Sequence, residues 1–327
     1  MKISIYPSYR KDKKQGNPFI NNLYDCFPED AEIHYVYGRN QKGLINNLFS
    51  SKIYIMNWPE NVIFDTLGFI QIFVFIACLG VLLVRKVKFV WFFHNIEPHE
   101  GHNLYSRFIY KFMLKHSSLI ISLSKKGREY LVGKTNAIIK YYPHPFKSIG
   151  EKGISFKKEY DLYIWGSINK YKGIVEFLQM LKDKGVDNKY RILITGKCKD
   201  SIYDSNIKSL LTDNIVYENI YIDNDKLIHN MNLSRYILFP YLDNSVSSSG
   251  ALMDTLENLA QVIGPNIGAF KDANEENVCL TYDKYDDIIQ ILDLNLKVDT
   301  DAIKAYVANN QWSLFGQRLY DDLLSIS

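Results

Sequence analysis

Short apolar runs alternate along the chain with segments in which apolar residues recur every three or four positions. The runs predict buried strands, and the recurring segments predict helices that pack on them. In the first half we expect strands at 3–6, 32–37, 53–56, 89–93, 118–123 and 137–140. Between them we expect helices at 19–27, 62–84, 104–115 and 125–132. This alternation predicts a parallel sheet covered on both faces.

The segment 142–146 interrupts the alternation, because Pro143 and Pro145 remove backbone donors and hold their neighbours extended. Beyond it we expect strands at 160–165, 190–195, 215–217, 236–239 and 261–264, and helices at 174–184, 205–211, 225–231 and 250–259. We therefore predict an α/β protein of two Rossmann-like, doubly wound domains facing a central cleft. The domains are expected at 1–145 and 146–300, and 301–327 is expected as a C-terminal helix packing back on the first domain.

The segment 62–84 is apolar over 23 residues, with Asp65 as its only charge. It is long enough to span a bilayer. A spanning helix would, however, place the strands on either side of it on opposite faces of the membrane. We therefore prefer a helix buried between the sheet and either its neighbours or the membrane surface.

Charge is unevenly distributed between the two halves. The 327 residues include 39 Lys+Arg and 36 Asp+Glu, a formal charge of +3. Residues 1–150 hold 20 and 10 of these, a charge of +10, whereas residues 151–327 hold 19 and 26, a charge of −7. The basic half predicts an anionic partner such as nucleic acid, an anionic membrane or a phosphorylated substrate; uneven solvation of two ordinary domains is the alternative. Four widely separated cysteines and no signal-like start predict a cytoplasmic protein without disulfides.

Titratable residues are concentrated directly after the strand expected at 89–93. They are His94, Glu97, His99, Glu100 and His102. Such a group at a strand end suits proton transfer or the binding of substrate hydroxyls. A metal site would need these side chains to converge, and no H-E-x-x-H pairing is present, so we expect no metal. The alternative is that the histidines only bond to nearby backbone.

The loop after the strand expected at 160–165 suits an anion. It contains Gly166, Ser167, Lys170 and Lys172, so that free amides at a helix start and an ammonium can meet a phosphate. A plain turn is the alternative.

A second anion-suited loop contains Ser247, Ser248, Ser249 and Gly250, at the start of the helix expected at 250–259. Asp254, one turn further on, suits a ribose hydroxyl. The alternatives are a simple helix cap and a surface carboxylate. Two such loops in one domain predict a diphosphate site.

Eight short motifs follow one another along nearly the whole chain. They are Gln15-Gly16-Asn17-Pro18-Phe19, Asn57-Trp58-Pro59-Glu60, His94-Asn95 with Pro98-His99-Glu100, Tyr142-Pro143-His144-Pro145, Tyr171-Lys172-Gly173-Ile174, Phe239-Pro240-Tyr241, Ser248-Ser249-Gly250 and Val262-Ile263-Gly264-Pro265. In this order they resemble GT-B glycosyltransferases, in particular the family 4-like enzymes that build bacterial exopolysaccharide, capsule and lipopolysaccharide.

The resemblance implies that the first domain binds the acceptor and the second binds a nucleoside diphosphate-sugar, without an obligatory metal or other cofactor. Lys172 matches the diphosphate-binding lysine of the family. Ser167 stands where the family has a basic residue, for which Lys170 is a substitute. Of the two glutamates that the family places eight positions apart, the first is Val246 here and Asp254 lies near the second. Retention and inversion of the anomeric centre therefore both stay open.

If the enzyme inverts, Glu100, Glu97 or His94 is expected as general base. If it retains, His94 is expected to contact the donor sugar. In both cases Lys172 and the amides at the two helix starts are expected to stabilise the leaving diphosphate.

The resemblance also implies an acceptor side, to which we assign Gly16, Asn17, Asn95 and His99. Such enzymes often use a lipid-linked acceptor at the cytoplasmic face of the inner membrane. We therefore expect a glycolipid or oligosaccharide acceptor and a peripheral position on anionic lipid. The basic residues expected to meet that lipid are Arg10, Lys11, Lys13, Lys14, Arg85, Lys86 and Lys88.

Two other classes of protein fit parts of the sequence. A non-enzymatic, two-domain sugar-binding protein would share the paired α/β layout. A nucleic-acid-binding protein would explain the basic half, but the aromatic residues there lie in apolar runs and do not alternate with Lys and Arg. We therefore expect no nucleic-acid partner.

Overall fold

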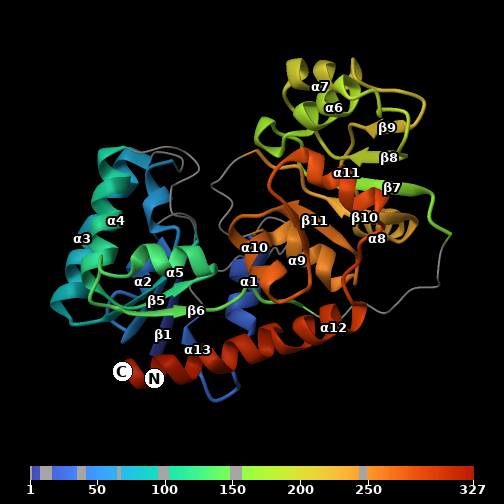
Figure 1. Cartoon of the computed structure of the whole chain (residues 1–327). Coiled ribbons are helices and arrows are strands. Elements are labelled where there is room, and N and C mark those ends of the chain that lie inside the picture. The colour runs from blue at the N-terminus through green and yellow to red at the C-terminus, as the bar shows by residue number, and fades with distance from the viewer. Residues whose placement is uncertain are drawn as a thin grey trace. The chain divides into compact units, whose positions relative to one another are not determined.

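The chain divides into two compact units (Figure 1). The computed structural model describes residues 2–7, 17–34, 42–64, 68–94, 103–147, 157–242 and 249–327. Unit 1 comprises residues 1–145 and 310–327, and unit 2 comprises residues 146–309. Each unit is built on its own sheet.

The sheet of unit 1 has six parallel strands in the order β2-β1-β3-β4-β5-β6. The strands are β1 (Lys2–Tyr6), β2 (Glu32–His34), β3 (Ile53–Asn57), β4 (Lys88–Phe93), β5 (Ser117–Ser122) and β6 (Ile138–Tyr141). Strands β3 and β4 lie at its centre, and all their residues except Lys88 are buried. This burial on both faces explains their unbroken apolar sequences.

Helices cover both faces of this sheet. They are α1 (Pro18–Asp25), α2 (Lys42–Asn46), the 3-10 helix η1 (Pro59–Phe64), α3 (Gly68–Val84), α4 (Leu104–His116), α5 (Lys125–Leu131) and α13 (Trp312–Ile326). One apolar layer holds residues of α1 and α13, and the other holds residues of α3, α4 and α5. A parallel doubly wound sheet needs two such layers.

The segment 62–84 is not one helix. Residues 59–64 form η1, and α3 begins only at Gly68. The buried residues of α3, from Gln71 through Phe75 to Leu82, recur at helical spacing and pack on the sheet. In the described part of the chain, no helix is both long and apolar enough to cross a bilayer.

Unit 2 has a second parallel sheet, in the order β12-β11-β10-β7-β8-β9. Its strands are β7 (Tyr160–Trp165), β8 (Ile192–Thr195), β9 (Ile215–Glu218), β10 (Ser234–Leu238), β11 (Val262–Pro265) and β12 (Leu280–Tyr282). Its helices are η2 (Lys170–Lys172), α6 (Ile174–Asp183), α7 (Ser201–Lys208), α8 (Asn224–Leu233), α9 (Gly250–Glu257), α10 (Gly268–Glu275), α11 (Tyr285–Asp293) and α12 (Thr300–Asn309). The predicted two-sheet α/β architecture is thus confirmed, and β12, α10 and α11 are additions to it.

The single C-terminal helix expected over 301–327 is two helices. Helix α12 belongs to unit 2, where Ile303 and Val307 enter the core. Helix α13 belongs to unit 1, where Trp312 and Leu319 pack with residues of the sheet. The segment 310–311 separates them, so the expected helix is divided between the two units.

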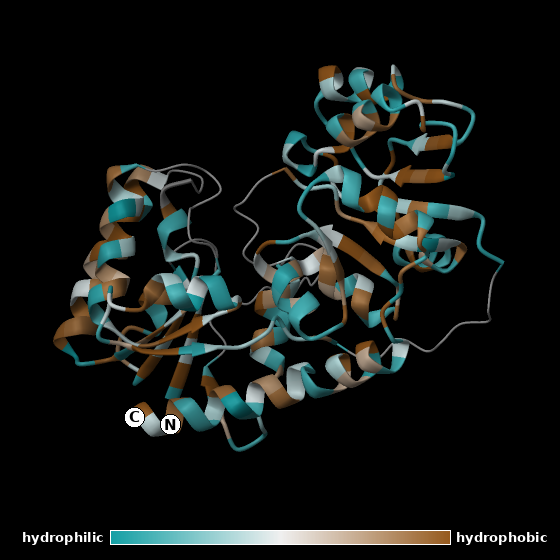
Figure 2. Cartoon of the chain, in the orientation of Figure 1, coloured by the Kyte–Doolittle hydropathy of each residue, from teal (hydrophilic) through white to brown (hydrophobic). Residues whose placement is uncertain are grey.

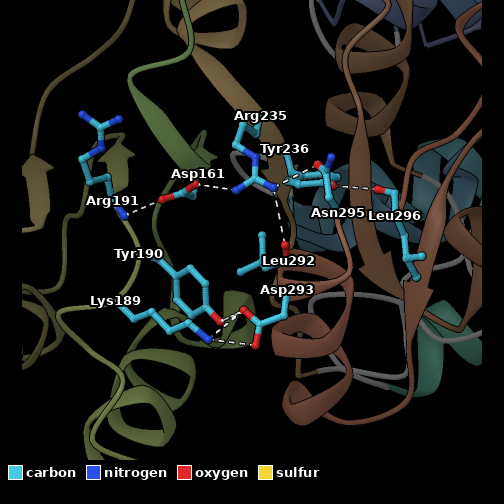
Figure 3. Close-up of polar contacts among 10 residues, drawn as sticks. All are labelled: Asp161, Lys189, Tyr190, Arg191, Arg235, Tyr236, Leu292, Asp293, Asn295 and Leu296. Atoms are coloured by element: carbon cyan, nitrogen blue, oxygen red, sulfur yellow. Dashed lines mark hydrogen bonds and ion pairs between the residues drawn. The ribbon is translucent and has the colours of Figure 1, made fainter.

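A polar cluster holds the amino-terminal edge of the unit 2 sheet to α11 (Figure 3). The Arg235 guanidinium lies 2.7 Å from Asp161 Oδ1 and donates to Asn295 Oδ1 at 3.0 Å. Tyr236 donates to the Leu296 carbonyl at 2.7 Å. These residues stand at the beginning of β7 and β10 and just after α11. The cluster therefore lies at the opposite end of the strands from the loops that suit an anion.

Candidate functional site

The loop after β7 places a lysine ammonium directly over a glycine. Lys172 is only 5% exposed, and its Nζ donates to the Trp165 carbonyl at 3.2 Å. A Cβ added to Gly166 would lie 2.9 Å from this Nζ, and Gly166 has a φ of +97°. The backbone conformation therefore favours glycine at this position, whereas the flexible end of the lysine side chain can shift away from an added Cβ.

Burial lowers the pKa of Lys172 to about 8, because the ammonium loses hydration. Among the described residues no carboxylate forms an ion pair with it. The ring centroid of Tyr241 lies 5.6 Å from Nζ. A buried cation without a counter-ion is suited to an anionic ligand.

Helix α9 starts beside this ammonium. Ser249 caps the helix by accepting from the Leu252 amide at 3.2 Å, and Tyr241 forms a hydrogen bond with Ser249. Gly250 is exposed, with no atom within 4 Å of the position of an added Cβ. Trp165 Nε1 donates to Thr255 Oγ1 at 3.2 Å, which ties α9 to the end of β7. The structure thus assembles Gly166, Lys172, Ser249 and Gly250 at one edge of the sheet.

The other residues predicted to bind the nucleotide-sugar donor are less closely grouped with Lys172. Ser167 is exposed. Lys170 forms an ion pair of 3.6 Å with Asp200, so its ammonium has a carboxylate partner of its own. Asp254 is exposed on α9, and its assignment to a ribose stays a prediction.

In unit 1, His94 lies at the carboxyl end of β4 and is buried. Its Nε2 is 3.1 Å from Asn57 Oδ1, and Asn57 Nδ2 donates to the Tyr6 carbonyl at 3.1 Å. Because the amide nitrogen is directed to Tyr6, the oxygen faces His94 and Nε2 must carry the proton. The Nδ1 of His94 is therefore the acceptor nitrogen.

Aromatic rings surround the His94 imidazole. Trp58 stacks on it with a centroid distance of 3.9 Å, and Phe19 contacts it edge-on at 5.0 Å. Trp58 has a φ of 46°, which is strained for a bulky residue and typical of functional sites. Burial, and secondarily His144, holds the pKa of His94 well below its usual value. His94 is thus a neutral imidazole at ordinary pH.

Phe19 links this group to the rest of unit 1. Its ring lies 5.3 Å from that of His144, in the segment after β6, and 5.2 Å from that of Trp312 in α13. Asn17, predicted on the acceptor side, caps α1 by accepting from the Phe19 amide at 2.9 Å. The side chain of Asn17 therefore has a structural role in holding the start of α1.

Sequence reasoning identified neither the partner of His94 nor a buried acid that lies close to that partner in the sequence. Asn57 belonged to the Asn57-Trp58-Pro59-Glu60 motif, but no role in the site was assigned to it. Glu60, three residues on, is buried, and burial raises its pKa to about 7. In the described part of the chain its Oε2 has no hydrogen-bond partner, and neither has Trp91 Nε1. The sequence feature that could have pointed to both residues is the Asn-Trp-Pro-Glu segment, with its polar Asn and Glu, at the end of a buried strand.

Seven predicted site residues lie outside the described residues. They are Gly16, Asn95, Glu97, His99, Glu100, Ser247 and Ser248. Their assignments stay predictions. No group of three or more His, Cys, Asp or Glu side chains in the described ranges is arranged to hold a metal ion.

Solved structures share this fold over almost the entire chain. AviGT4, a glycosyltransferase involved in avilamycin A biosynthesis, has 13% identity and a TM-score of 0.62, with 98% of this chain and 96% of that chain covered. Anabaena Alr3699/HepE, solved with UDP and glucose, has 12% identity and a TM-score of 0.63, covering 99% and 100%. A glycosyltransferase from Rickettsia africae ESF-5 has 14% identity and a TM-score of 0.63, covering 99% and 98%. No protein-family model and no curated protein matches the sequence. The fold is that of GT-B glycosyltransferases.

Proposed function

We propose that the protein is a glycosyltransferase that moves a sugar from a nucleoside diphosphate-sugar to a saccharide acceptor. The observation that carries this proposal is the buried Lys172 ammonium over Gly166, at the carboxyl edge of the unit 2 sheet. Ligands of open α/β sheets bind at that edge. The solved structures with this fold include glycosyltransferases, one of them holding UDP and glucose.

In this proposal unit 2 binds the donor. The leaving diphosphate accepts hydrogen bonds from Lys172 and from the free amides at the start of α9, which together offset its charge. No metal or other cofactor is required for this role. Ser247 and Ser248 add donors to the same helix start, and Asp254 accepts from the ribose.

Unit 1 binds the acceptor. In this proposal His94 Nδ1 accepts from a hydroxyl, because Nε2 is occupied by Asn57. If the reaction inverts the anomeric centre, the base that takes the acceptor proton is His94, Glu97 or Glu100. If it retains, His94 Nδ1 accepts from a hydroxyl of the donor sugar.

The acceptor in this proposal is a glycolipid or oligosaccharide of bacterial surface polysaccharide synthesis. The enzyme works at the cytoplasmic face of the inner membrane. Support for this part comes from the charge of +10 in residues 1–150, which favours an anionic surface.

Thermal shift with a panel of UDP-, GDP-, dTDP- and CMP-sugars tests the donor assignment. A ligand at one hundred times its Kd stabilises its protein by about 2.7 kcal/mol. We expect one nucleotide class to raise the melting temperature and Lys172→Ala to abolish that rise. No stabilisation by any member of the panel would contradict the proposal, as would stabilisation that survives in Lys172→Ala.

A further inference from the structure

The solvent-facing side of α3 is apolar along its whole length. Its exposed residues are Phe69, Ile70, Phe73, Ala77, Gly80, Leu83 and Val84, without one polar side chain. Phe69 is 60% exposed and Val84 is 84% exposed. A surface helix normally turns polar residues outward, as α13 of the same unit does with Gln317, Arg318 and Asp321. One side of α3 therefore meets the core and the other is an apolar surface without a partner in the described structure (Figure 2).

Helix α4 extends this surface. Tyr105 contacts both Phe69 and Phe73, with centroid distances of 6.0 and 6.4 Å, so the two helices lie side by side at their amino-terminal ends (Figure 1). Leu104 is 81% exposed and Phe108 is 49% exposed on the outer side of α4. The apolar area thus spans two helices.

The same outer side of α4 carries Arg107, Lys111 and Lys115, all exposed. Neither helix contains an Asp or a Glu. We call the exposed residues of α3 and α4 together the α3–α4 face. It combines an apolar strip, about 25 Å long at 1.5 Å per residue, with cationic side chains and no anionic ones.

We propose that the α3–α4 face docks the protein on an anionic lipid bilayer, lying in the interface without crossing it. Lipid supplies both acyl chains for Phe69, Phe73 and Phe108 and phosphates for the lysines. A second copy of this chain fits less well, because an isologous contact would bring like charges together. The choice of lipid over an acidic protein rests on the proposed lipid-linked acceptor.

The position of this face suits such an acceptor. The helices of a parallel doubly wound sheet begin at the carboxyl edge of its strands. Phe69, Phe73 and Tyr105 therefore lie toward the edge that holds Asn57 and His94. A bilayer against these residues would present a lipid-linked saccharide to that edge.

Of the basic residues expected to meet lipid, Arg10, Lys11, Lys13 and Lys14 lie outside the described residues, and Lys86 and Lys88 are exposed. The Arg85 guanidinium donates to the carbonyls of Leu48 and Phe49 and lies 5.6 Å from the Phe49 ring centroid. Arg85 thus joins the end of α3 to the segment after α2. In this proposal Lys111 and Lys115 of α4 take the role in lipid binding that we expected of Arg85.

Flotation of the full chain with phospholipid vesicles tests the proposal. We expect binding to vesicles of phosphatidylcholine and phosphatidylglycerol, and weaker binding to phosphatidylcholine alone or at high salt. Each cation near an anionic surface contributes about 1 kcal/mol, or about fivefold, so Lys111→Glu with Lys115→Glu should weaken binding about 30-fold or more. Phe69→Ser with Phe73→Ser should weaken it about tenfold or more.

Matched controls come from unit 2. Ile202→Ser with Leu294→Ser removes apolar side chains that are 70% and 69% exposed, and Lys182→Glu with Lys297→Glu makes the same charge change. Both control pairs should bind vesicles like the wild type. Unbound wild-type protein, or equal loss in variants and controls, would overturn the assignment. A dimer that Phe69→Ser with Phe73→Ser converts to a monomer, without vesicle binding, would show that a second copy covers the face.

The vesicle assay is independent of catalysis. The two α3–α4 face variants should keep the donor-induced thermal shift, whereas Lys172→Ala should lose that shift and keep vesicle binding. A failure of the docking proposal can therefore be told apart from a failure of the proposed activity.

Discussion

Asn57 Oδ1 lies 3.1 Å from His94 Nε2; Asn57 ends β3, and His94 directly follows the neighbouring strand β4. Because Asn57 Nδ2 is bound to the Tyr6 carbonyl, the amide cannot turn over without losing that bond. Asn57 therefore fixes the tautomer of His94 and leaves Nδ1 as the acceptor. This makes Asn57 a positioning residue for the proposed reaction.

We predict that Asn57→Leu lowers kcat by about tenfold or more, since losing one buried hydrogen bond costs about 1–3 kcal/mol. Asn57→Asp should instead place a carboxylate beside Nε2, raise the pKa of His94 and move the acid limb of the pH–rate profile to higher pH. The imidazole nitrogen chemical shifts report the tautomer directly. If both variants keep the wild-type pH profile and tautomer, Asn57 has no positioning role.

The prediction of the fold from sequence succeeded where local pattern determines structure. Central strands such as β4 are buried on both faces, so their unbroken apolar runs were visible. Strand β12 was missed, because it has three residues and only Tyr282 is fully buried. The start of α3 was misplaced, because apolar content alone does not show where a 3-10 helix gives way to an α-helix.

In the candidate site, too, local features could be predicted from the sequence and long-range contacts could not. Lys172 and Gly166 are six residues apart in one loop, so the local sequence was enough to assign both to a single anion-suited loop. Asn57 and His94 are 37 residues apart, and their hydrogen bond depends on the register in which Asn57 pairs with Phe92. That register is set by the packing of the whole sheet and not by any local sequence. The pairing could therefore be found only in three dimensions.

Glu60 gives a stability prediction for unit 1. Burial raises its pKa from 4.5 to about 7, so the folded protein keeps a proton that the unfolded chain has lost. Stability should therefore fall as pH rises from about 4.5 to 7, by roughly 3 kcal/mol at 1.36 kcal/mol per pKa unit. Glu60→Gln should remove most of this decline. Thermal melts of both proteins across that window test this, and parallel curves would refute it.

Variants of Arg235 should change the stability of unit 2 without changing donor binding. Its guanidinium joins β10 to Asp161 and Asn295 at the amino-terminal edge of the unit 2 sheet (Figure 3). Arg235→Ala removes the hydrogen bonds to both partners and should lower the melting temperature, for a cost of about 1–3 kcal/mol. Arg235→Lys should restore part of the loss. Because the cluster lies at the opposite edge from Lys172, donor affinity below the melting transition should be unchanged in both variants; a loss of affinity would show that the two edges are coupled.

The buried ammonium of Lys172 should lower the free energy of unfolding of the protein, although the same group is proposed to bind the donor. Burial lowers its pKa from 10.5 to about 8, equivalent to roughly 3 kcal/mol against the charged form. Between those pH values the unfolded chain binds more protons than the folded one, so stability should rise with pH through that window. At pH 7 the penalty is fully present. Lys172→Met, which keeps the length of the side chain without the charge, should therefore raise the melting temperature while abolishing donor binding.

Lys170→Met is the matched control, because Lys170 lies in the same loop but is 72% exposed, in an ion pair with Asp200. Its effect on stability should stay within about 0.5 kcal/mol. Wild-type donor affinity should also decrease above about pH 8, as Lys172 loses the proton that binds the diphosphate. Thermal melts and donor titrations across pH measure both effects. A less stable Lys172→Met protein would show that the ammonium is a structural group, and affinity that is constant through pH 8 would show that it does not hold the diphosphate.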